Sequence, residues 1–172
     1  LGATVDLSEQ YLVSCNTSGW GCSGGWWPYD MIVAGVPYET AFPYTATDAP
    51  CQPVTPVYRA TGYTFIAGAN TVPAVDLIKQ AIYDNGGVTV GVYVDRWFQA
   101  YTGGTLTKCA RNPRGVNHMV QLVGWDDARG AWKLKNSWGT GWGEDGYVWI
   151  KYGCDLVGYG ASYLIGALPI VN

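Results

Sequence analysis

The 172-residue chain carries a net charge of −3, with 13% charged and 15% aromatic side chains. A chain of this length can bury a real hydrophobic core, and so many rings with so few charges argue against disorder. Its lysines and arginines form no cluster, and no apolar run is long enough to span a bilayer. We therefore expect neither a nucleic-acid partner nor a membrane-embedded protein.

The cysteines are five, an odd number, and their spacing contains no C-x-x-C zinc pattern. We expect no metal site, and no cofactor is indicated. Asn16-Thr17-Ser18 is an N-glycosylation triplet in a segment rich in Gly and Ser. The cysteines, the triplet and an acidic pI of about 4.9 together favour a secreted, lysosomal or vacuolar compartment, where disulfides persist.

The first third of the chain predicts short helices joined by irregular segments. A helix is expected from Asp6, which can cap it with Glu9 three residues later, to about Cys15. A Gly-rich loop with three tryptophans follows at residues 19–27. Pro28 suits the first turn of a second helix, which Gly35 can end in a left-handed cap. Five prolines between residues 36 and 56 indicate irregular chain.

The remainder predicts one strong helix and several strands. Residues 58–66 are β-rich, and Thr71 and Pro73 open a helix that Gly86-Gly87 ends. This helix should bury the stripe Ala74, Leu77, Ile78, Ala81 and Ile82. Residues 97–104 are rich in aromatic side chains and predict a turn. Strands are expected at residues 88–94, 116–125, 131–136, 147–151 and 162–167.

This order of elements indicates an α+β protein with two parts. The first third is helical and the last half is β-rich, with a junction near residues 63–70. We therefore expect a helical domain over residues 1–65 and a β domain over residues 66–172.

A predicted hairpin brings together the only histidine, His118, and Asn136. If its loop centres on Ala128, Asn136 lies opposite Val120, and His118 lies opposite Trp138. Side chains alternate between the two faces of a strand, so His118 and Asn136 share the buried face as diagonal neighbours. An Asn amide can then reach an imidazole nitrogen.

The segment that follows Asn136 is the most distinctive in the chain, with four glycines and two tryptophans in residues 135–147. A buried Asn and His can simply satisfy each other's hydrogen bonds, and for a lone His this structural reading comes first. Trp138 beside the pair shifts the balance. An indole over the bond excludes water and fixes one tautomer, which holds an imidazole ready as base and acid.

The chain resembles the papain-like cysteine proteases at several collinear motifs. These are Leu7-Ser8-Glu9-Gln10 leading to Cys15, Gly21-Cys22-Ser23-Gly24-Gly25, Pro43-Tyr44, Tyr101-Thr102-Gly103-Gly104, Asn117-His118, and Lys135-Asn136-Ser137-Trp138-Gly139 continuing to Trp142-Gly143 and Gly146-Tyr147.

The resemblance implies a papain-like fold with a partial helical left domain and a β-barrel right domain, and endopeptidase activity on polypeptide substrates. It implies a Cys–His–Asn site in which His118 is base and acid and Asn136 orients it. It also implies binding of possible propeptides or cystatin-like inhibitors. The implied substrate-binding residues are Gly24 and Gly25 as a backbone strip, Trp26, Tyr93, Asn117 and Met119 as a side-chain pocket, Trp138 as a shield and Trp142 on the leaving-group side.

The chain departs from the family pattern at the nucleophile. In the family the nucleophilic Cys precedes the Ser-Glu-Gln helix, in a Cys-Gly-Ser/Ala-Cys-Trp/Tyr run. This sequence begins at Leu1, after that position. The resemblance implies disulfides Cys15–Cys51 and Cys109–Cys154, and it pairs Cys22 with a cysteine near the nucleophile. We therefore expect an N-terminal segment or chain that carries the nucleophile and a partner for Cys22.

Two other interpretations remain open. The protein can be a catalytically inactive relative that binds peptides without cleaving them. It can also be an aromatic-rich module that binds carbohydrate on the indoles of Trp20, Trp26 and Trp27. Carbohydrate binding leaves the grouping of His118, Asn136 and Trp138 unexplained.

Overall fold

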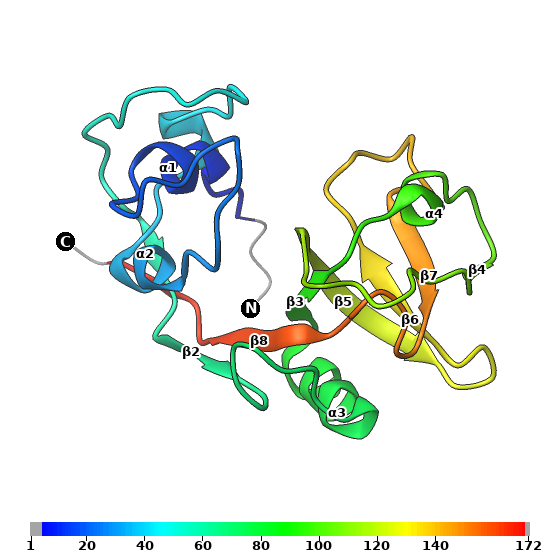
Figure 1. Ribbon diagram of the computed structural model, residues 1–172. Coiled ribbons are helices and arrows are strands. Elements are labelled where there is room, and N and C mark those ends of the chain that lie inside the picture. Colours follow the sequence, from blue (N-terminus) through cyan, green and yellow to red (C-terminus); the bar gives the residue numbers. More distant parts are fainter. Residues whose placement is uncertain (1–4, 171–172) are drawn as a thin grey trace. The chain divides into compact units, whose positions relative to one another are not determined.

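The computed structural model describes residues 5–170 and divides them into two compact units (Figure 1). The first unit contains residues 5–63 and 164–170, and the second contains residues 64–163. The expected domain division after residue 65 stays a prediction. The two compact units do not coincide with this expected division, because residues 164–170 belong to the first unit. There, β9 (Leu168–Pro169) pairs with β1 (Tyr58–Arg59).

The first helix, α1 (Glu9–Ser14), begins at Ser8 and not at Asp6 as expected. The Ser8 hydroxyl oxygen accepts a hydrogen bond from the Tyr11 backbone N–H at 2.9 Å, and the hydroxyl donates to the Phe42 carbonyl at 2.6 Å. Ser8 is buried, so one hydroxyl both caps the helix and fixes a distant loop. The expectation of Asp6 as cap was wrong by two residues.

The second helix, α2 (Tyr29–Ala34), begins after Pro28, as expected. Gly35 ends it with φ +129° and ψ +149°, which is an extended positive-φ conformation and not the expected left-handed cap. A side chain at Gly35 would also overlap Pro56 and Ile170, so glycine is required there. Residues 36–57 contain one short 3₁₀ helix, η1 (Glu39–Ala41), in agreement with the irregular chain that their prolines indicate.

A seven-stranded sheet dominates the second unit, in the order β2-β8-β3-β5-β6-β7-β4. Most neighbours are antiparallel, whereas β4 and β7 are parallel. The strands are β2 (Gly62–Phe65), β3 (Val88–Val92), β4 (Thr105–Leu106), β5 (His118–Asp126), β6 (Ala131–Lys135), β7 (Tyr147–Lys151) and β8 (Tyr159–Ile165).

Helix α3 (Val75–Asn85) packs on this sheet and ends at Gly86, which adopts the left-handed conformation at φ +79°. Ile78, Ala81 and Ile82 are buried as the stripe predicted. Ala74 and Leu77 are exposed, Leu77 to 51%, so two positions of the expected stripe were wrong.

The expectation of a turn at residues 97–104 was also wrong in part. Asp95 accepts hydrogen bonds from the Trp97 and Phe98 backbone N–H groups and so caps a short helix, α4 (Arg96–Gln99). The cap lies just outside the segment that looked turn-like, and Phe98 on this helix is fully buried.

The core of the second unit is apolar and continuous. Its fully buried side chains include Val88, Val90, Val92, Phe98, Leu122, Leu134, Val148 and Ile150.

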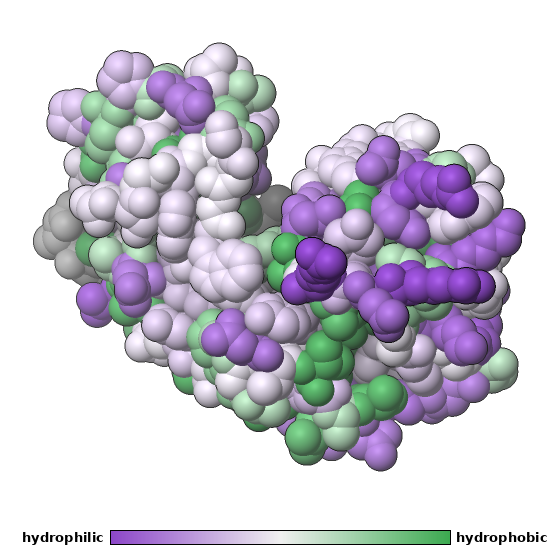
Figure 2. Space-filling view, viewed as in Figure 1, coloured by the Kyte–Doolittle hydropathy of each residue, from purple (hydrophilic) through white to green (hydrophobic). Residues whose placement is uncertain are grey.

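The surfaces of the two units differ in polarity. Figure 2 shows that strongly hydrophilic side chains gather on the outside of the second unit, whereas pale, weakly polar side chains prevail on the visible face of the first unit. No helix within residues 5–170 has the length and apolar character needed to cross a bilayer.

Candidate functional site

The β5–β6 hairpin has the register that the sequence predicted near His118, although its turn differs. Gln121 pairs with Lys135 and Leu122 with Leu134, a register that carries Asn136 opposite Val120. Next to the turn, Asp126 pairs with Ala131, and a bulge between Leu122 and Gly124 absorbs the one-residue difference. The bulge restores the predicted register where it decides which side chains meet.

The His118 imidazole and the Asn136 amide form a hydrogen bond of 2.8 Å between Nε2 and Oδ1. The Ser137 backbone N–H also donates to this oxygen at 2.8 Å, which identifies it as the acceptor. Since a carbonyl oxygen cannot donate, Nε2 must carry the proton. In the neutral imidazole, Nδ1 is then the free acceptor.

Asn136 is 8% exposed, whereas His118 is half-buried. Within residues 5–170, the Asn136 Nδ2 atom makes no hydrogen bond. The Asn136 backbone N–H donates to the Gly146 carbonyl at 3.0 Å, which fixes the strand end from which the amide projects. Burial and this anchor hold the amide oxygen in place, so it can set the orientation of the imidazole.

A cluster of three aromatic rings lies beside the imidazole. The Trp138 ring centroid is 5.2 Å from that of His118, with 30° between the planes. Trp142 meets Trp138 edge-on at 5.1 Å and stacks on Phe98 at 5.3 Å. Trp138 is 40% exposed, so it covers the imidazole on one side and leaves its own outer side in solvent.

Glycines shape the loop that carries these indoles. Gly139, Gly143 and Gly146 have φ values of +79°, +61° and +87°. A side chain at Gly143 would overlap the Tyr147 carbonyl oxygen. The loop therefore depends on glycine both for its backbone conformation and for close approach.

The other expected binding residues of the second unit lie at or near the paired ends of β3 and β5, or in the loop that follows Asn136. Asn117 is exposed, and its amide exchanges two hydrogen bonds with the Val94 backbone, at 2.7 and 3.1 Å. Met119 lies opposite Gly91 on β3, and Tyr93 follows that strand. Trp142 donates from Nε1 to the Gln99 carbonyl at 3.1 Å. Asn117 thus extends the pairing of β3 and β5 beyond the strand end.

The expected backbone strip belongs to the first unit. Gly21 and Gly24 exchange backbone hydrogen bonds of 3.2 and 3.0 Å, so that Cys22 and Ser23 form the tip of a tight turn. Gly25 approaches Trp20 so closely that a side chain at position 25 would crowd the indole. Trp26 is exposed and meets the buried Trp27 edge-on at 4.6 Å. Glycine at these positions keeps the strip narrow and exposed.

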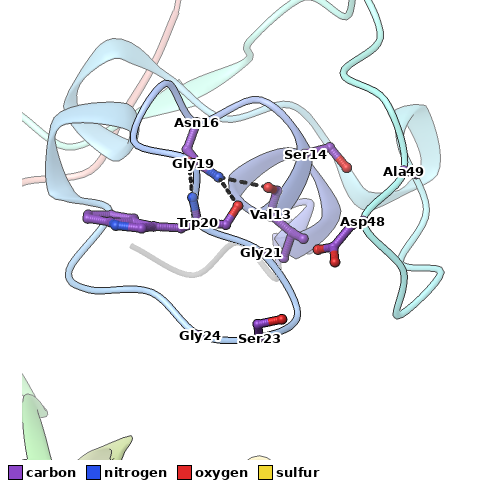
Figure 3. A pocket seen from close by; sticks show the side chains of 10 residues that line it. All are labelled: Val13, Ser14, Asn16, Gly19, Trp20, Gly21, Ser23, Gly24, Asp48 and Ala49. Atoms are coloured by element: carbon purple, nitrogen blue, oxygen red, sulfur yellow. Dashed lines mark hydrogen bonds between the residues drawn. The ribbon is translucent and has the colours of Figure 1, made fainter.

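A cavity of about 440 Å³ lies next to this turn (Figure 3). Asn16 forms one wall, and its Nδ2 atom donates to the carbonyls of Leu12, Val13 and Trp20 at 2.7–3.1 Å. A glycan on Nδ2 would replace one of the two hydrogens that make these bonds, and glycosylation at this triplet stays a prediction. The lining residues are Val13, Ser14, Asn16, Gly19, Trp20, Gly21, Ser23, Gly24, Asp48 and Ala49.

The structure joins both pairs of cysteines that the resemblance implied, Cys15–Cys51 and Cys109–Cys154. Cys22 is a free, exposed thiol. Its backbone N–H donates to Asp48 Oδ1 at 2.6 Å. Partial desolvation and the Asp48 carboxylate raise the pKa of the Cys22 thiol. This environment is the opposite of that of a nucleophilic cysteine, which needs a lowered pKa.

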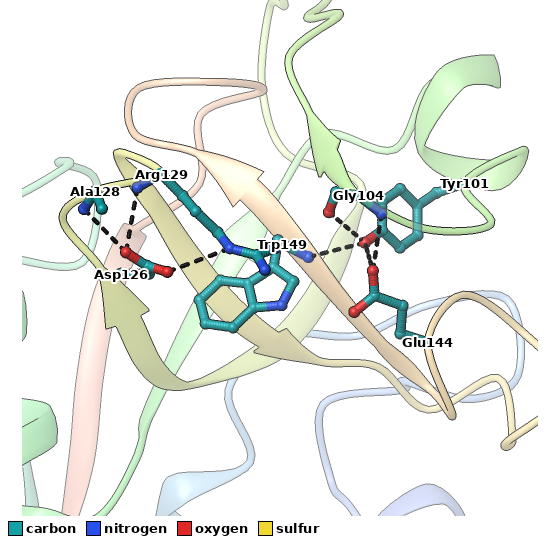
Figure 4. Close-up of polar contacts among 7 residues, drawn as sticks. All are labelled: Tyr101, Gly104, Asp126, Ala128, Arg129, Glu144 and Trp149. Atoms are coloured by element: carbon teal, nitrogen blue, oxygen red, sulfur yellow. Dashed lines mark hydrogen bonds and ion pairs between the residues drawn. The ribbon is translucent and has the colours of Figure 1, made fainter.

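Sequence reasoning gave no role to Glu144, and it noted Tyr101 only as part of a motif. The Glu144 carboxylate accepts hydrogen bonds from the Tyr101 hydroxyl at 3.0 Å and from the Gly104 backbone N–H at 2.8 Å (Figure 4). Burial raises the pKa of Tyr101 to about 12, so its phenol stays protonated and remains a donor. The signal that could have found this pair is the acidic dipeptide Glu144-Asp145 within a glycine-rich loop.

Comparisons with known proteins agree with this geometry. The model of the papain family cysteine proteases matches residues 2–165. Cathepsin L 2 of Paramecium tetraurelia is 39% identical over 89% of the chain and 47% of its own length. The bromelain protease of Ananas comosus, solved with the E64 inhibitor, is 27% identical with a TM-score of 0.77, over 95% of this chain and 80% of that one.

A ragweed pollen cysteine protease, Amb a 11 in its proform, gives a TM-score of 0.82 at 27% identity, over 95% of this chain and 53% of that one. The chain spans about half the length or less of the curated relatives it matches, with 47% and 32% in two cases. The family match extends over most of the chain, and the solved relatives share its α+β fold. The chain belongs to the papain family of cysteine proteases.

Proposed function

We propose that the full-length protein is a cysteine endopeptidase in which His118 acts as general base and acid and Asn136 orients it. The observation that carries this proposal is the 2.8 Å bond from His118 Nε2 to a buried amide oxygen. The bond commits the proton to Nε2 and leaves Nδ1 to take a proton from a thiol and return it to a leaving amine. Trp138 limits the access of water to this bond.

The nucleophile comes from polypeptide outside this sequence. Four of the five cysteines are joined in disulfides, and a disulfide sulfur has no proton to lose. The fifth, Cys22, lies beside Asp48, which disfavours the thiolate. No cysteine among residues 5–170 therefore has the environment of a nucleophile.

The same outside segment pairs with Cys22. That thiol is exposed at the tip of the Gly21–Gly24 turn, and residues on both sides of it line the cavity shown in Figure 3. A segment placed against this cavity brings its own cysteine within reach of Cys22. The solved Amb a 11 proform makes a propeptide a reasonable further partner, and E64 bound to bromelain does the same for small inhibitors.

The substrate is an extended polypeptide. The exposed, narrow strip at Gly24 and Gly25 leaves its backbone open to hydrogen bonds with a peptide strand. We infer substrate contacts at Trp26 in the first unit and at Tyr93, Asn117 and Met119 in the second unit, with Trp142 on the leaving-group side. Two disulfides support a secreted, lysosomal or vacuolar location.

The second candidate function is peptide binding without cleavage. It is favoured by one observation, that none of the cysteines in the described residues has the environment of a nucleophile. Carbohydrate binding on a tryptophan platform has less support, because Trp27 is buried and the family match covers the segment.

The test uses His118→Ala and Asn136→Ala in the full-length protein. We expect a loss of kcat of about 10²–10⁴-fold for His118→Ala and a smaller loss for Asn136→Ala, with the unfolding free energy almost unchanged. The matched control is Asn85→Ala, which removes an exposed amide that bonds only to the preceding helical turn. Peptide hydrolysis by the full-length protein also separates cleavage from binding alone.

Two results would contradict the proposal. One is hydrolysis of a peptide substrate by residues 1–172 alone that a thiol-alkylating reagent inhibits, which would place the nucleophile within this sequence. The other is an Asn136→Ala variant whose loss of activity only follows its loss of folded protein, which would make the His–Asn bond structural.

A further inference from the structure

The Glu144 carboxylate joins two loops of the second unit that are 40 residues apart in sequence. Its Oε1 atom accepts from the Gly104 backbone N–H and from the Tyr101 hydroxyl, as Figure 4 shows. We call this arrangement the Glu144 clamp. Gly104 has φ +82°, a left-handed conformation that glycine adopts readily, and its N–H points to the carboxylate.

The Tyr101 side of the clamp is buried and hydrogen-bonded on several sides. The phenol is buried, and its hydrogen is shared between the Gly104 carbonyl at 2.8 Å and Glu144 at 3.0 Å. Its oxygen also accepts from the Trp149 backbone N–H on β7 at 3.4 Å. One phenol thus fastens residues 101–104 to the sheet and to the carboxylate.

The other side of the clamp leads to the indole loop. The Glu144 backbone exchanges hydrogen bonds of 2.9 and 3.0 Å with Tyr147, and the Gly146 N–H donates to the Trp142 carbonyl at 2.8 Å. Glu144 and Trp142 therefore belong to one tight turn. The Trp142 ring also lies 5.9 Å from the Tyr101 ring, so the clamp fixes this indole through both backbone and ring contacts.

From Trp142 the contacts continue to the imidazole. Trp142 meets Trp138 edge-on, and Trp138 lies beside His118. The backbone of the same loop reaches Asn136, whose N–H donates to Gly146. A shift of the turn at Glu144 therefore reaches both the shield over the imidazole and the strand end that carries its orienting amide.

We propose that Glu144 is a positioning residue for the His118–Asn136 pair: it holds the Trp142 turn, and through it Trp138 and Asn136, in the geometry that proton transfer requires. This inference rests on the proposed peptidase function. Glu144 touches neither the imidazole nor the amide, so its effect is transmitted by the turn and by ring packing. Displacements of about 1 Å from distant changes can lower rates by about 10²-fold.

The test compares Glu144→Ala with Glu144→Gln in the full-length protein. Alanine removes the acceptor, whereas the Gln carbonyl oxygen can still accept from Tyr101 and Gly104. We expect Glu144→Ala to lower kcat by about tenfold with KM within about twofold, and Glu144→Gln to stay within about threefold of wild type. The second readout is solvent exchange of the His118 Nε2 proton by NMR, assigned by its absence in His118→Gln. This exchange should be faster in Glu144→Ala and near wild type in Glu144→Gln.

The matched control is Asp126→Ala. Asp126 also braces a loop of this sheet, by accepting from Ala128 and Arg129 backbone N–H groups, but it lies at the far end of β5, about 25 Å from His118 along the strand. It should leave kcat and Nε2 proton exchange unchanged. Wild-type kcat and exchange in Glu144→Ala, or equal losses in Asp126→Ala, would overturn the inference. If wild type lacks peptidase activity, the proposed function fails, while proton exchange still decides whether the clamp positions His118.

Discussion

The two units of the chain are stabilised by different means. In the first unit, polar side chains bind distant backbone: Ser8 reaches Phe42, and Gln10 reaches residues 45 and 47. The Cys15–Cys51 disulfide adds a covalent link, and the helices α1 and α2 have only six residues each. In the second unit, antiparallel strand pairing and burial of a continuous apolar core are the main stabilising interactions.

This difference decides how each unit can serve a site. The second unit places His118 and Asn136 through strand register, which the whole hairpin determines and which a single surface change cannot shift. The first unit presents an exposed backbone strip at Gly24 and Gly25, whose shape depends on a few polar contacts near Asn16, Trp20 and Asp48. Substitutions should therefore act through the core in one unit and through single hydrogen bonds in the other.

The largest effect is expected from Leu134→Ala in the second unit. Leu134 is fully buried opposite Leu122 and two residues before Asn136. Loss of its side chain leaves a cavity, and we expect the unfolding free energy to fall by about 2–5 kcal/mol in denaturant titration. Leu77→Ala removes the same atoms from an exposed site on α3 and should cost less than about 1 kcal/mol. Equal costs for the two variants would contradict a stability dominated by the core.

A smaller effect is expected from Gln10→Met in the first unit. Gln10 is fully buried, and its amide bonds to Ser14, Thr45 and Thr47 at 2.8–3.0 Å. Methionine keeps the volume but leaves these groups without that partner, which should cost about 1–3 kcal/mol. Hydrogen exchange should show the loss in residues 8–48 and leave the β5–β6 amides protected.

The matched control for this variant is Gln80→Met in the second unit. Gln80 is exposed and bonds only to Asp84 on the same helix, so its replacement should change stability little. Faster exchange in the β5–β6 strands of Gln10→Met would show that the two units do not respond separately.

The sequence predicted the site in the second unit better than it predicted the first unit. The His118 and Asn136 pairing followed from strand alternation, and the two glycines after α3 marked its end. The bulge near Val123 was not visible in the pattern, because a one-residue insertion into a ladder leaves no compositional mark. The predicted pairing of His118 and Asn136 is correct because two errors cancel. The turn lies half a residue from its predicted centre, and the bulge that was not predicted shifts the register back.

Errors elsewhere have local physical causes. Asp6 and Ser8 are both good helix caps, and only the buried contact of Ser8 with Phe42 decides between them. Leu77 fits the apolar period of the helix, but its side chain lies outside the core, whereas that of the next residue, Ile78, is buried. Strand β9 pairs with β1 over more than 100 residues of sequence, and nothing in a two-residue strand indicates such a partner.

The smallest effect is expected from Asp155→Asn, which tests how the apolar second unit tolerates a carboxylate. Asp155 is buried beside the Cys109–Cys154 disulfide, and it accepts from the Ala110 backbone N–H at 2.7 Å. Burial and, less strongly, the nearby Asp95 raise the pKa of this carboxyl in the folded state. Asparagine can keep the acceptor and can adopt the φ of +49° that Asp155 has.

The raised pKa sets the sign of the pH dependence. The folded state binds the Asp155 proton more tightly than the unfolded state, so the stability that this group contributes is present below the unfolded pKa of about 3.9 and is lost as pH rises through the folded pKa. Asp155→Asn should therefore be more stable than wild type at pH 7, with a difference that shrinks toward pH 3 in thermal unfolding. Asp127→Asn is the opposite control, because its hydrogen bond with Lys79 lowers the pKa of Asp127 and gives a contribution that is lost as pH falls. If both variants shift stability in the same direction across this pH range, the buried carboxylate is not a cost to the second unit.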